Sequence, residues 1–511
     1  MKFGKIVFIS LLVTHFAYIY ALTSYASGLS VALFLLALAG MLAVKLGFMS
    51  KVPFKVTGLV LILVSANVAL ETSSPPTPLR NNIAIVGGSI ITGKNDFDVI
   101  ANGTVLIDQS GSIVKVGASE VVEVPDDYEV IDATDKFVMP GLINAHTHLF
   151  QDAGDPDAPL DLTKMAPPGY RHQINMYIAE TYLGRRYLAS IMEENAKKEL
   201  FTGVTTLRAI GEIGFLDVAL RERISKGETV GPNLLVAGKI LAITGGHAAD
   251  IGIVFNGPTE ARRSVRESLR NKVDFIKITS TGGVADSRRL GEAGELQMTF
   301  EEIRAVTDEA HRKNFLVAAH AESTEGVREA LLAGVDNIEH GSTLDEEMIE
   351  LFRNNPNSLR GFTSLHPTLS IFGGEIDWSP EAKASPTLTI VGLNTMEIGK
   401  QLVEGFKQAV DGGVLVGLGT DSGFISHEMA WKELKYFVEF GGVSNSQAIH
   451  MGTLATAKSI GVDAETGSIE VGKRADMLVL DGDPRKDLSF IGKPSVIAVN
   501  GYIHQRTQTE R

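Results

Sequence analysis

Two histidines stand one residue apart at the end of the apolar segment MPGLINAHTH, which runs from Met139 to His148. On a β-strand, residues i and i+2 point to the same side, so the imidazoles of His146 and His148 can converge on one metal ion. A single His-x-His pair is weak evidence by itself, because alternating polar residues are common on strands. Its meaning depends on the residues that follow it along the chain.

Four further residues with side chains suited to metal chemistry follow, each at or just past the end of a short, strand-like apolar run. They are Lys277 in DFIKI, His320 in VAAHAE, His340 in NIEHG and Asp421 in GLGTDSG. The chain contains no cysteine, so the ligands of any metal must be histidine, carboxylate or modified lysine. We therefore predict a metal centre. Singly, each histidine could be a core residue, the lysine a surface residue and the aspartate a helix N-cap.

The elements that must position these residues are strands and helices in alternation. We count eight candidate strands, ending near residues 148, 208, 238, 279, 321, 341, 367 and 421, with helices such as 299–314 and 324–333 between them. This alternation is typical of the α/β class and of a parallel (β/α)8 TIM barrel, here over residues 139–465, whose catalytic groups gather at the C-terminal strand ends. The candidate ligands fall on strands one, four, five, six and eight of that count.

Short strands separated by turn residues flank the predicted barrel on both sides. We expect residues 82–138 and 466–511 to meet as one small β-sandwich. Residues 73–81, with SSPPTP, are predicted to form a stiff linker.

Three apolar stretches occur in residues 1–72, at 6–26, 28–44 and 56–69. A bilayer span needs roughly 20 apolar residues, which the first stretch provides, whereas the third is short enough to be part of a cleaved signal. Lysines cluster before the first stretch and between the second and third. We therefore predict a multi-pass membrane protein with about three transmembrane helices and its catalytic domain on the non-cytoplasmic side, periplasmic or extracellular.

The formal net charge is −14, and residues 1–70 contain five lysines and no acidic residue. The rest of the chain is therefore more acidic than the total indicates. An acidic surface argues against nucleic acid as a partner, because phosphate neutralisation needs a basic face. The sequence leaves the oligomeric state open, a homo-oligomer included.

Residues 82–507 resemble the amidohydrolase superfamily of metal-dependent hydrolases. The resemblance includes the closing segment EVGKRADMLVLDGDP at residues 470–484. FIKITSTGG at 275–283 and TGGH at 244–247 are similar to the branch that contains Xaa-Pro and Xaa-Arg dipeptidases and imidazolonepropionase-related proteins. One departure is Ala209, because relatives commonly carry an aspartate after the arginine of strand two.

The resemblance implies two divalent metal ions, with zinc the first expectation and manganese, cobalt or iron also compatible with the ligands. In binuclear members the His-x-His pair and the aspartate of strand eight hold one ion, and the histidines of strands five and six hold the other. A carboxylated lysine and a hydroxide bridge them. Carried over, the first ion takes His146, His148 and Asp421, the second takes His320 and His340, and Lys277, carboxylated by CO2, is the bridge.

The same resemblance implies a hydrolytic mechanism. Two cations lower the pKa of a shared water from 15.7 to roughly 7. Asp421 then acts as the catalytic base and passes the proton to the leaving amine. His247, after a Gly-Gly turn, is expected to be a catalytic residue that binds the substrate carbonyl or carboxylate. Arg208, at the end of strand two, is expected to meet a substrate carboxylate or a buried acid.

Two acidic residues, Glu322 and Glu339, neighbour predicted ligands and either support them or point outward. The favoured function is a membrane-anchored hydrolase of C–N bonds. Its expected substrate is a small molecule, either a dipeptide or an N-acyl amino acid. Lys277 disfavours the alternative of a mononuclear deaminase or cyclic-amide hydrolase. An ester or phosphotriester hydrolase stays open, as does, outside the enzymes, a catalytically idle barrel on a membrane protein.

Overall fold

The computed structural model describes residues 81–94, 98–151, 181–371 and 390–505. By its contacts the chain divides into residues 1–76 and residues 77–511, and every element below belongs to the second unit. The three predicted membrane stretches and almost all of the predicted linker lie outside the described residues.

Parallel strands form the wall of the predicted barrel. They are β6 (Leu142–Thr147), β7 (Val204–Ala209), β8 (Asn233–Val236), β11 (Ile276–Thr279), β12 (Val317–Ala321), β13 (Asn337–His340) and β14 (Ser364–His366). Strands β6 to β8 make one sheet, and β11 to β14 make another with β9 (Leu241–Ile243) and β10 (Ile253–Phe255). All residues of β12 and β13 are buried, as expected for strands covered on both faces. The predicted TIM barrel is confirmed.

The eighth strand of the barrel is an extended segment rather than a regular strand. It is joined to both neighbours by single bridges, Leu365 with Val416 and Thr147 with Ser422. The amide of Ala145 also donates a 2.8 Å hydrogen bond to the carbonyl of Leu418. These contacts close the barrel next to β6.

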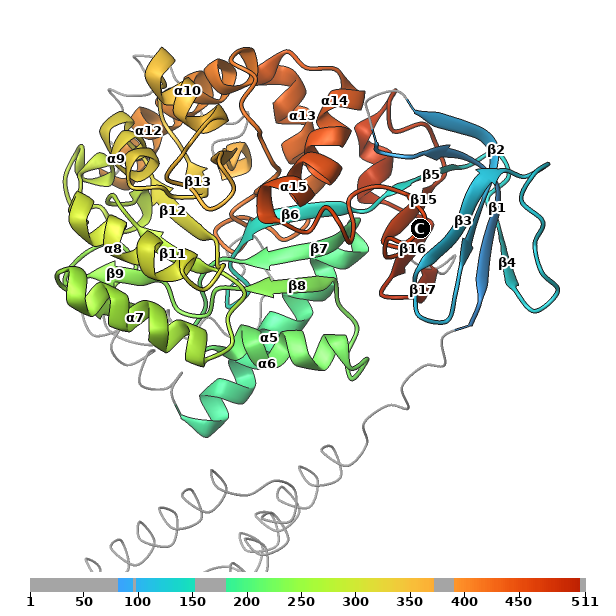
Figure 1. Cartoon of the computed structure of the whole chain (residues 1–511), viewed down its shortest axis with the longest axis horizontal. Coiled ribbons are helices and arrows are strands. Elements are labelled where there is room, and N and C mark those ends of the chain that lie inside the picture. The colour runs from blue at the N-terminus through green and yellow to red at the C-terminus, as the bar shows by residue number, and fades with distance from the viewer. Residues whose placement is uncertain (1–80, 95–97, 152–180, 372–389, 506–511) are drawn as a thin grey trace, which may run out of the picture. The chain divides into compact units, whose positions relative to one another are not determined.

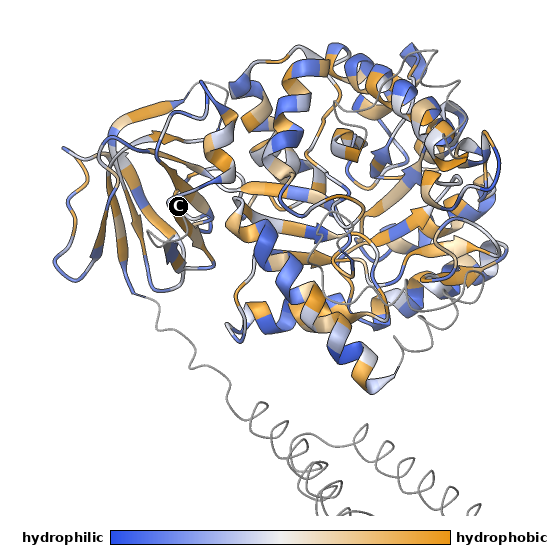
Figure 2. Ribbon diagram, turned by 180° about the vertical axis from the view of Figure 1, so that it is seen from behind, coloured by the Kyte–Doolittle hydropathy of each residue, from blue (hydrophilic) through white to orange (hydrophobic). Residues whose placement is uncertain are grey.

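Helices surround the strands (Figure 1). They are α5 (Tyr182–Phe201), α6 (Leu216–Ser225), α7 (Pro258–Arg270), α8 (Phe300–His311), α9 (Thr324–Leu332), α10 (Glu346–Arg353), α12 (Ile390–Asp411), α13 (Ala430–Gly441), α14 (Asn445–His450) and α15 (Thr456–Ile460). Short helical turns are η2 (Val284–Asp286), η3 (Glu292–Gly294), η4 (Leu369–Ile371), the π-helical η5 (Met451–Ala455) and η6 (Leu488–Gly492). Helix α8 begins at a capping box, in which Thr299 and Glu302 satisfy each other's backbone amides. Figure 2 shows largely hydrophobic strands inside helices that alternate between hydrophobic and hydrophilic residues.

The strands that flank the barrel in sequence join in one eight-stranded sheet. They are β1 (Ile83–Ile91), β2 (Val99–Ile107), β3 (Ile113–Ala118), β4 (Glu129–Asp132), β5 (Phe137–Pro140), β15 (Met477–Leu480), β16 (Val496–Val499) and β17 (Tyr502–Gln505). The order is β17-β16-β15-β5-β1-β2-β3, with β4 also paired to β1. Strands from both ends of the chain are therefore neighbours, seen as blue and red arrows in Figure 1.

Strand β1 serves two neighbours in turn. Its first residues pair with β4 and its later ones with β5, and the ladder with β2 is irregular around Gly88. A Cβ at Gly88 would lie 2.8 Å from the side chain of Val138, so only glycine allows this close approach. Strand β5 then continues through Gly141 into β6, which leads the chain from the sheet to the first two predicted ligands.

No helix in the described ranges is long and apolar enough to cross a bilayer. The two longest described helices, α5 with 20 residues and α12 with 22, carry charged side chains along their length. The predicted multi-pass membrane location, with a non-cytoplasmic catalytic domain, is therefore corrected. The apolar stretches on which it depended fall outside the described residues.

Candidate metal centre

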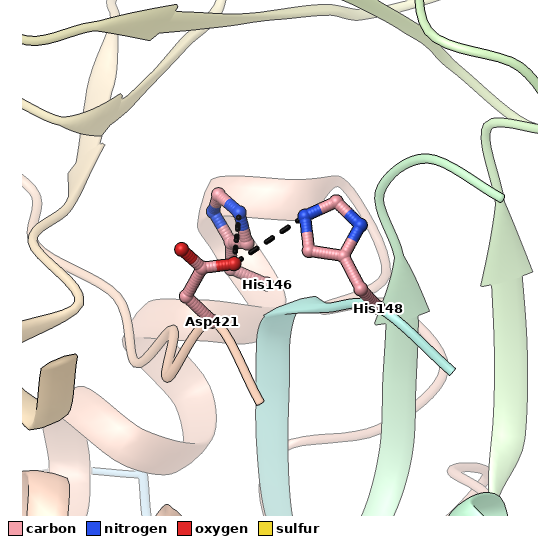
Figure 3. A group of neighbouring side chains, drawn as sticks. All are labelled: His146, His148 and Asp421. Atoms are coloured by element: carbon pink, nitrogen blue, oxygen red, sulfur yellow. Dashed lines mark ion pairs between the residues drawn. The ribbon is translucent and has the colours of Figure 1, made fainter. Parts of the chain in front are cut away.

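The first predicted ligand group converges at the C-terminal end of the barrel strands. His146 lies on β6, His148 just follows it, and Asp421 ends the extended eighth segment. The Nε2 atoms of both histidines are 3.3 Å from Oδ1 of Asp421 (Figure 3). All three side chains are buried. The structure thus brings Asp421 to two histidines that precede it in the sequence by more than 270 positions.

The second group lies beside the first. The donor atoms of His320 on β12, of Glu322 just after it and of His340 on β13 lie within 4.8 Å of one another. The ring of His340 is 4.6 Å from that of His320 and 4.9 Å from that of His146, measured between centroids. The two groups could therefore hold two neighbouring ions.

Lys277 lies on β11, next to β12, and lines the same cavity as the two groups. Its side chain is 2% exposed, and burial lowers the pKa of Lys277 to about 8. A buried ammonium is costly unless it is paired, and burial favours the neutral amine. The neutral amine is the form that can add CO2 to become a carbamate.

The histidines of the first group are held by hydrogen bonds on the far side of their rings. Nδ1 of His146 contacts Oε2 of Glu339 at 2.8 Å, and Nδ1 of His148 contacts the carbonyl of Gly211 at 2.8 Å. Since both acceptors lack a proton, each Nδ1 carries the hydrogen and each neutral ring presents a lone pair at Nε2. Burial lowers the pKa of His148, which favours that neutral form.

The histidines of the second group are oriented in the same way through different atoms. Nδ1 of His340 contacts the hydroxyl of Thr368 at 2.8 Å, which leaves Nε2 for a metal. Nε2 of His320 contacts the carbonyl of Gly282 at 2.8 Å, which leaves Nδ1. Burial holds the pKa of both histidines well below the usual value, so both rings are neutral and able to bind a metal.

Unsatisfied buried oxygens indicate that these residues fit a cation. Oδ1 of Asp421 and Oε2 of Glu322 are buried and have no hydrogen-bond donor. The Nε2 atoms of His146 and His148 lie 3.3 Å from Oδ1 of Asp421, and because each ring carries its hydrogen on Nδ1, neither Nε2 can donate a proton to it. A divalent ion in each donor group would give the unsatisfied oxygen of that group a positively charged partner.

Two predicted ligands have left-handed backbone conformations, which non-glycine residues rarely adopt. The φ angle is +68° at His340 and +58° at Asp421. Along a regular strand, the neighbours Glu339 and His340 would point to opposite sides. The left-handed turn at His340 instead lets Glu339 contact the ring of His146 while His340 lines the same cavity.

The metal groups lie in a cavity of about 520 Å³. Its apolar wall includes Phe150, Ile251 and Phe424, and its polar wall includes His247 and Arg288. A cavity of this size, in which apolar side chains adjoin the candidate metal ligands, suits a small-molecule substrate.

His247 lies where the sequence predicted, in the wall of the cavity. Its ring is 4.5 Å from that of His320, and its Nδ1 is 2.9 Å from Oδ1 of Asp286. Its backbone amide donates to Gln297 at 2.7 Å. Neither Asp286, at the end of η2, nor Arg288 could be found from the sequence, because the segment after β11 contains no strand or long helix whose periodicity would place them.

Arg208 is not a cavity residue, which corrects the predicted substrate contact. Its side chain is 1% exposed, and its Nη2 lies 2.5 Å from Oε1 of Glu339. Burial alone raises the pKa of Glu339, but Arg208, His366 and His146 outweigh it and hold that pKa well below its usual range. The structure therefore supports the other predicted alternative, that Arg208 meets a buried acid.

Residues 137–502 match the amidohydrolase family. The chain belongs to this family. It is therefore an enzyme, a hydrolase of carbon–nitrogen bonds, as the resemblance implied.

Three relatives show how far the similarity of this amidohydrolase extends. A crystal structure from Bifidobacterium longum, provisionally assigned as a prolidase, is 37% identical with a TM-score of 0.71 and covers 84% of this chain and 96% of its own. A Xaa-Pro dipeptidase with methionine bound in its active site is 30% identical, with a TM-score of 0.69. The alignment covers 83% of this chain and 100% of the dipeptidase. Ochratoxinase from Aspergillus niger is 26% identical over 444 residues, 81% of this chain and 84% of its own.

Proposed function

We propose that this amidohydrolase uses two divalent metal ions, zinc first among them, to hydrolyse the amide bond of a dipeptide or an N-acyl amino acid. The observation that carries the proposal is the pair of adjoining donor groups around the unsatisfied Oδ1 of Asp421. His146, His148 and Asp421 would hold one ion, and His320 and His340 the other. Lys277, as a carbamate, would join them.

The bound metals would acidify a water molecule and polarise the scissile carbonyl. Asp421 takes the proton from the attacking water and delivers it to the leaving nitrogen, so that the amine departs neutral. His247 offers the substrate a ring nitrogen, because its other nitrogen is held by Asp286. The apolar side chains of Phe150 and Phe424 in the cavity wall would pack against the apolar part of the substrate.

The relatives support the substrate class. The Xaa-Pro dipeptidase has an amino acid, methionine, bound in its active site, and its whole chain aligns with this one. In this chain, the exposed Arg288 is one of the residues that line the cavity, and its positive charge can attract a free carboxylate. A dipeptide and an N-acyl amino acid both present a carboxylate beside the amide.

The test is the metal content of the full chain, expressed with zinc and bicarbonate, beside its Lys277→Ala variant. We expect near two ions per chain in the wild type and a sharp fall in the variant, together with loss of hydrolysis of a dipeptide and N-acetyl amino acid panel. Lys226→Ala, at an exposed position at the end of α6, is the matched control and should change nothing. One ion per chain, unchanged in Lys277→Ala, would contradict the bridging role and redirect the search to deaminase-type and cyclic-amide substrates.

A further inference from the structure

In each of the four ligand histidines, the ring nitrogen that points away from the metal site donates a hydrogen bond. The acceptors of these four hydrogen bonds differ in charge. The donor nitrogens of His148 and His320 face backbone carbonyls, and that of His340 faces the hydroxyl of Thr368. Among these four, His146 alone faces a carboxylate, that of Glu339. An anionic acceptor draws the proton more strongly and makes the opposite nitrogen a better electron donor.

Glu339 is itself fixed in place on all sides. It is fully buried, with Oε2 contacting His146 and Oε1 contacting Nη2 of Arg208 at 2.5 Å and Nδ1 of His366 at 3.2 Å. Nε2 of His366 in turn contacts the hydroxyl of Ser459 at 2.8 Å. The carboxylate therefore cannot rotate away from His146 without breaking a buried contact.

Arg208 links this carboxylate to the strand that carries the first ligand. Its Nε donates a 2.6 Å hydrogen bond to the carbonyl of Ala145, the residue before His146. Its Nη1 donates a 2.8 Å hydrogen bond to Oδ1 of Asn337, two residues before Glu339. One guanidinium from β7 thus sets the spacing of β6 and β13 immediately beneath the metal centre.

We propose that Arg208 and Glu339 are positioning residues that make the His146, His148 and Asp421 site the tighter of the two metal sites. The inference rests on the proposed metal centre. Neither residue lines the cavity, so both act through His146, Glu339 through its ring and Arg208 through Glu339 and the backbone of β6. At the other site, Oε2 of Glu322 is 3.8 Å from Nε2 of His320, which is beyond hydrogen-bonding distance. Among the described residues, the ligands of that site are therefore held by a carbonyl and a hydroxyl and by no carboxylate hydrogen bond, which leaves that site the weaker one.

The test is a Co²⁺ titration of the chelator-treated full chain in bicarbonate, followed by visible absorption in the presence of a competing chelator. We expect a tight and a weak phase. His148→Ala and His320→Ala identify which site gives which phase. In Glu339→Gln we expect the affinity of the tight phase to fall by about 10–100-fold, with the weak phase unchanged.

Thr368→Val is the matched control, because it removes the neutral partner of His340 and keeps the shape of the side chain. It should weaken only the other phase. The inference is overturned if Glu339→Gln leaves the tight phase unchanged, or if His148→Ala removes the weak phase. Should Glu339→Gln fail to fold, the double variant Arg208→Met with Glu339→Gln replaces it, because it removes both buried charges. The same fall in the affinity of the tight phase is expected for the double variant.

The titration needs no substrate, so failure of the proposed hydrolysis does not affect it. If the wild type binds a single ion, the binuclear proposal fails. The positioning role then stands if that ion is lost in His148→Ala and weakened in Glu339→Gln. It is overturned if the ion is lost in His320→Ala and unaffected by Glu339→Gln.

Discussion

Replacing Arg208 by methionine should strongly destabilise the fold. The change leaves the carboxylate of Glu339 buried with no cation, and breaking a buried ion pair from one side costs about 3–5 kcal/mol. It also removes the donors of the Ala145 carbonyl and the Asn337 amide oxygen, at about 1 kcal/mol each. We expect the free energy of unfolding to fall by about 5–7 kcal/mol in total.

Urea unfolding of the metal-free chain, followed by circular dichroism, measures this loss without any contribution from bound ions. The double variant Arg208→Met with Glu339→Gln removes both charges and should be more stable than Arg208→Met alone by about 2–3 kcal/mol. Arg289→Met breaks an exposed pair with Glu295 and serves as the control, with no resolvable change expected. If Arg208→Met behaved like Arg289→Met, or if the double variant were no more stable than Arg208→Met, the reasoning about the buried charge would be refuted.

Two further predictions concern a buried acid and the cavity wall. Burial raises the pKa of Glu433 to about 7, so its contribution to stability is complete below its ordinary pKa of 4.5 and is lost as the pH rises through 7. Between pH 5 and pH 8 the wild type should therefore lose up to about 3 kcal/mol more unfolding free energy than Glu433→Gln; parallel pH profiles of the two proteins would contradict this. Asp286→Asn removes the anion that holds His247, and we expect kcat/KM on the best substrate of the panel to fall by about tenfold or more with metal content unchanged. An unaltered kcat/KM would show that His247 needs no fixed orientation.

The positions of the predicted ligands were readable from the sequence because each follows a short apolar run that the barrel turns into a buried strand. The described strands β6 to β8 and β11 to β14 end within two residues of the predicted positions. Periodicity and apolar content suffice for this, since parallel strands are buried on both faces.

The environment of the ligands was not readable, because it depends on backbone angles and on distant contacts. Strand periodicity predicts that the neighbours Glu339 and His340 point to opposite sides, and the left-handed φ of His340 breaks that alternation. Asp286 contacts the ring of His247 although the two residues are 39 positions apart in the sequence. No periodic pattern in the sequence predicts that contact. For Arg208 the sequence leaves two alternatives, because a charged residue at a strand end can face either the cavity or the interior, and only packing decides which.

The sheet that joins the two ends of the barrel has a consequence for biosynthesis. Strand β5 pairs with β15, for example Met139 with Leu478, so its partner is translated roughly 340 residues later. At about 5–20 residues per second, that interval is roughly 20–70 s, during which the edge of β5 stays open on the nascent chain. An open edge is a template for pairing with other chains. The hydrogen-bonding groups of β5 therefore need shielding at the ribosome until the last strands emerge, and the rate of translation through the barrel sets how long.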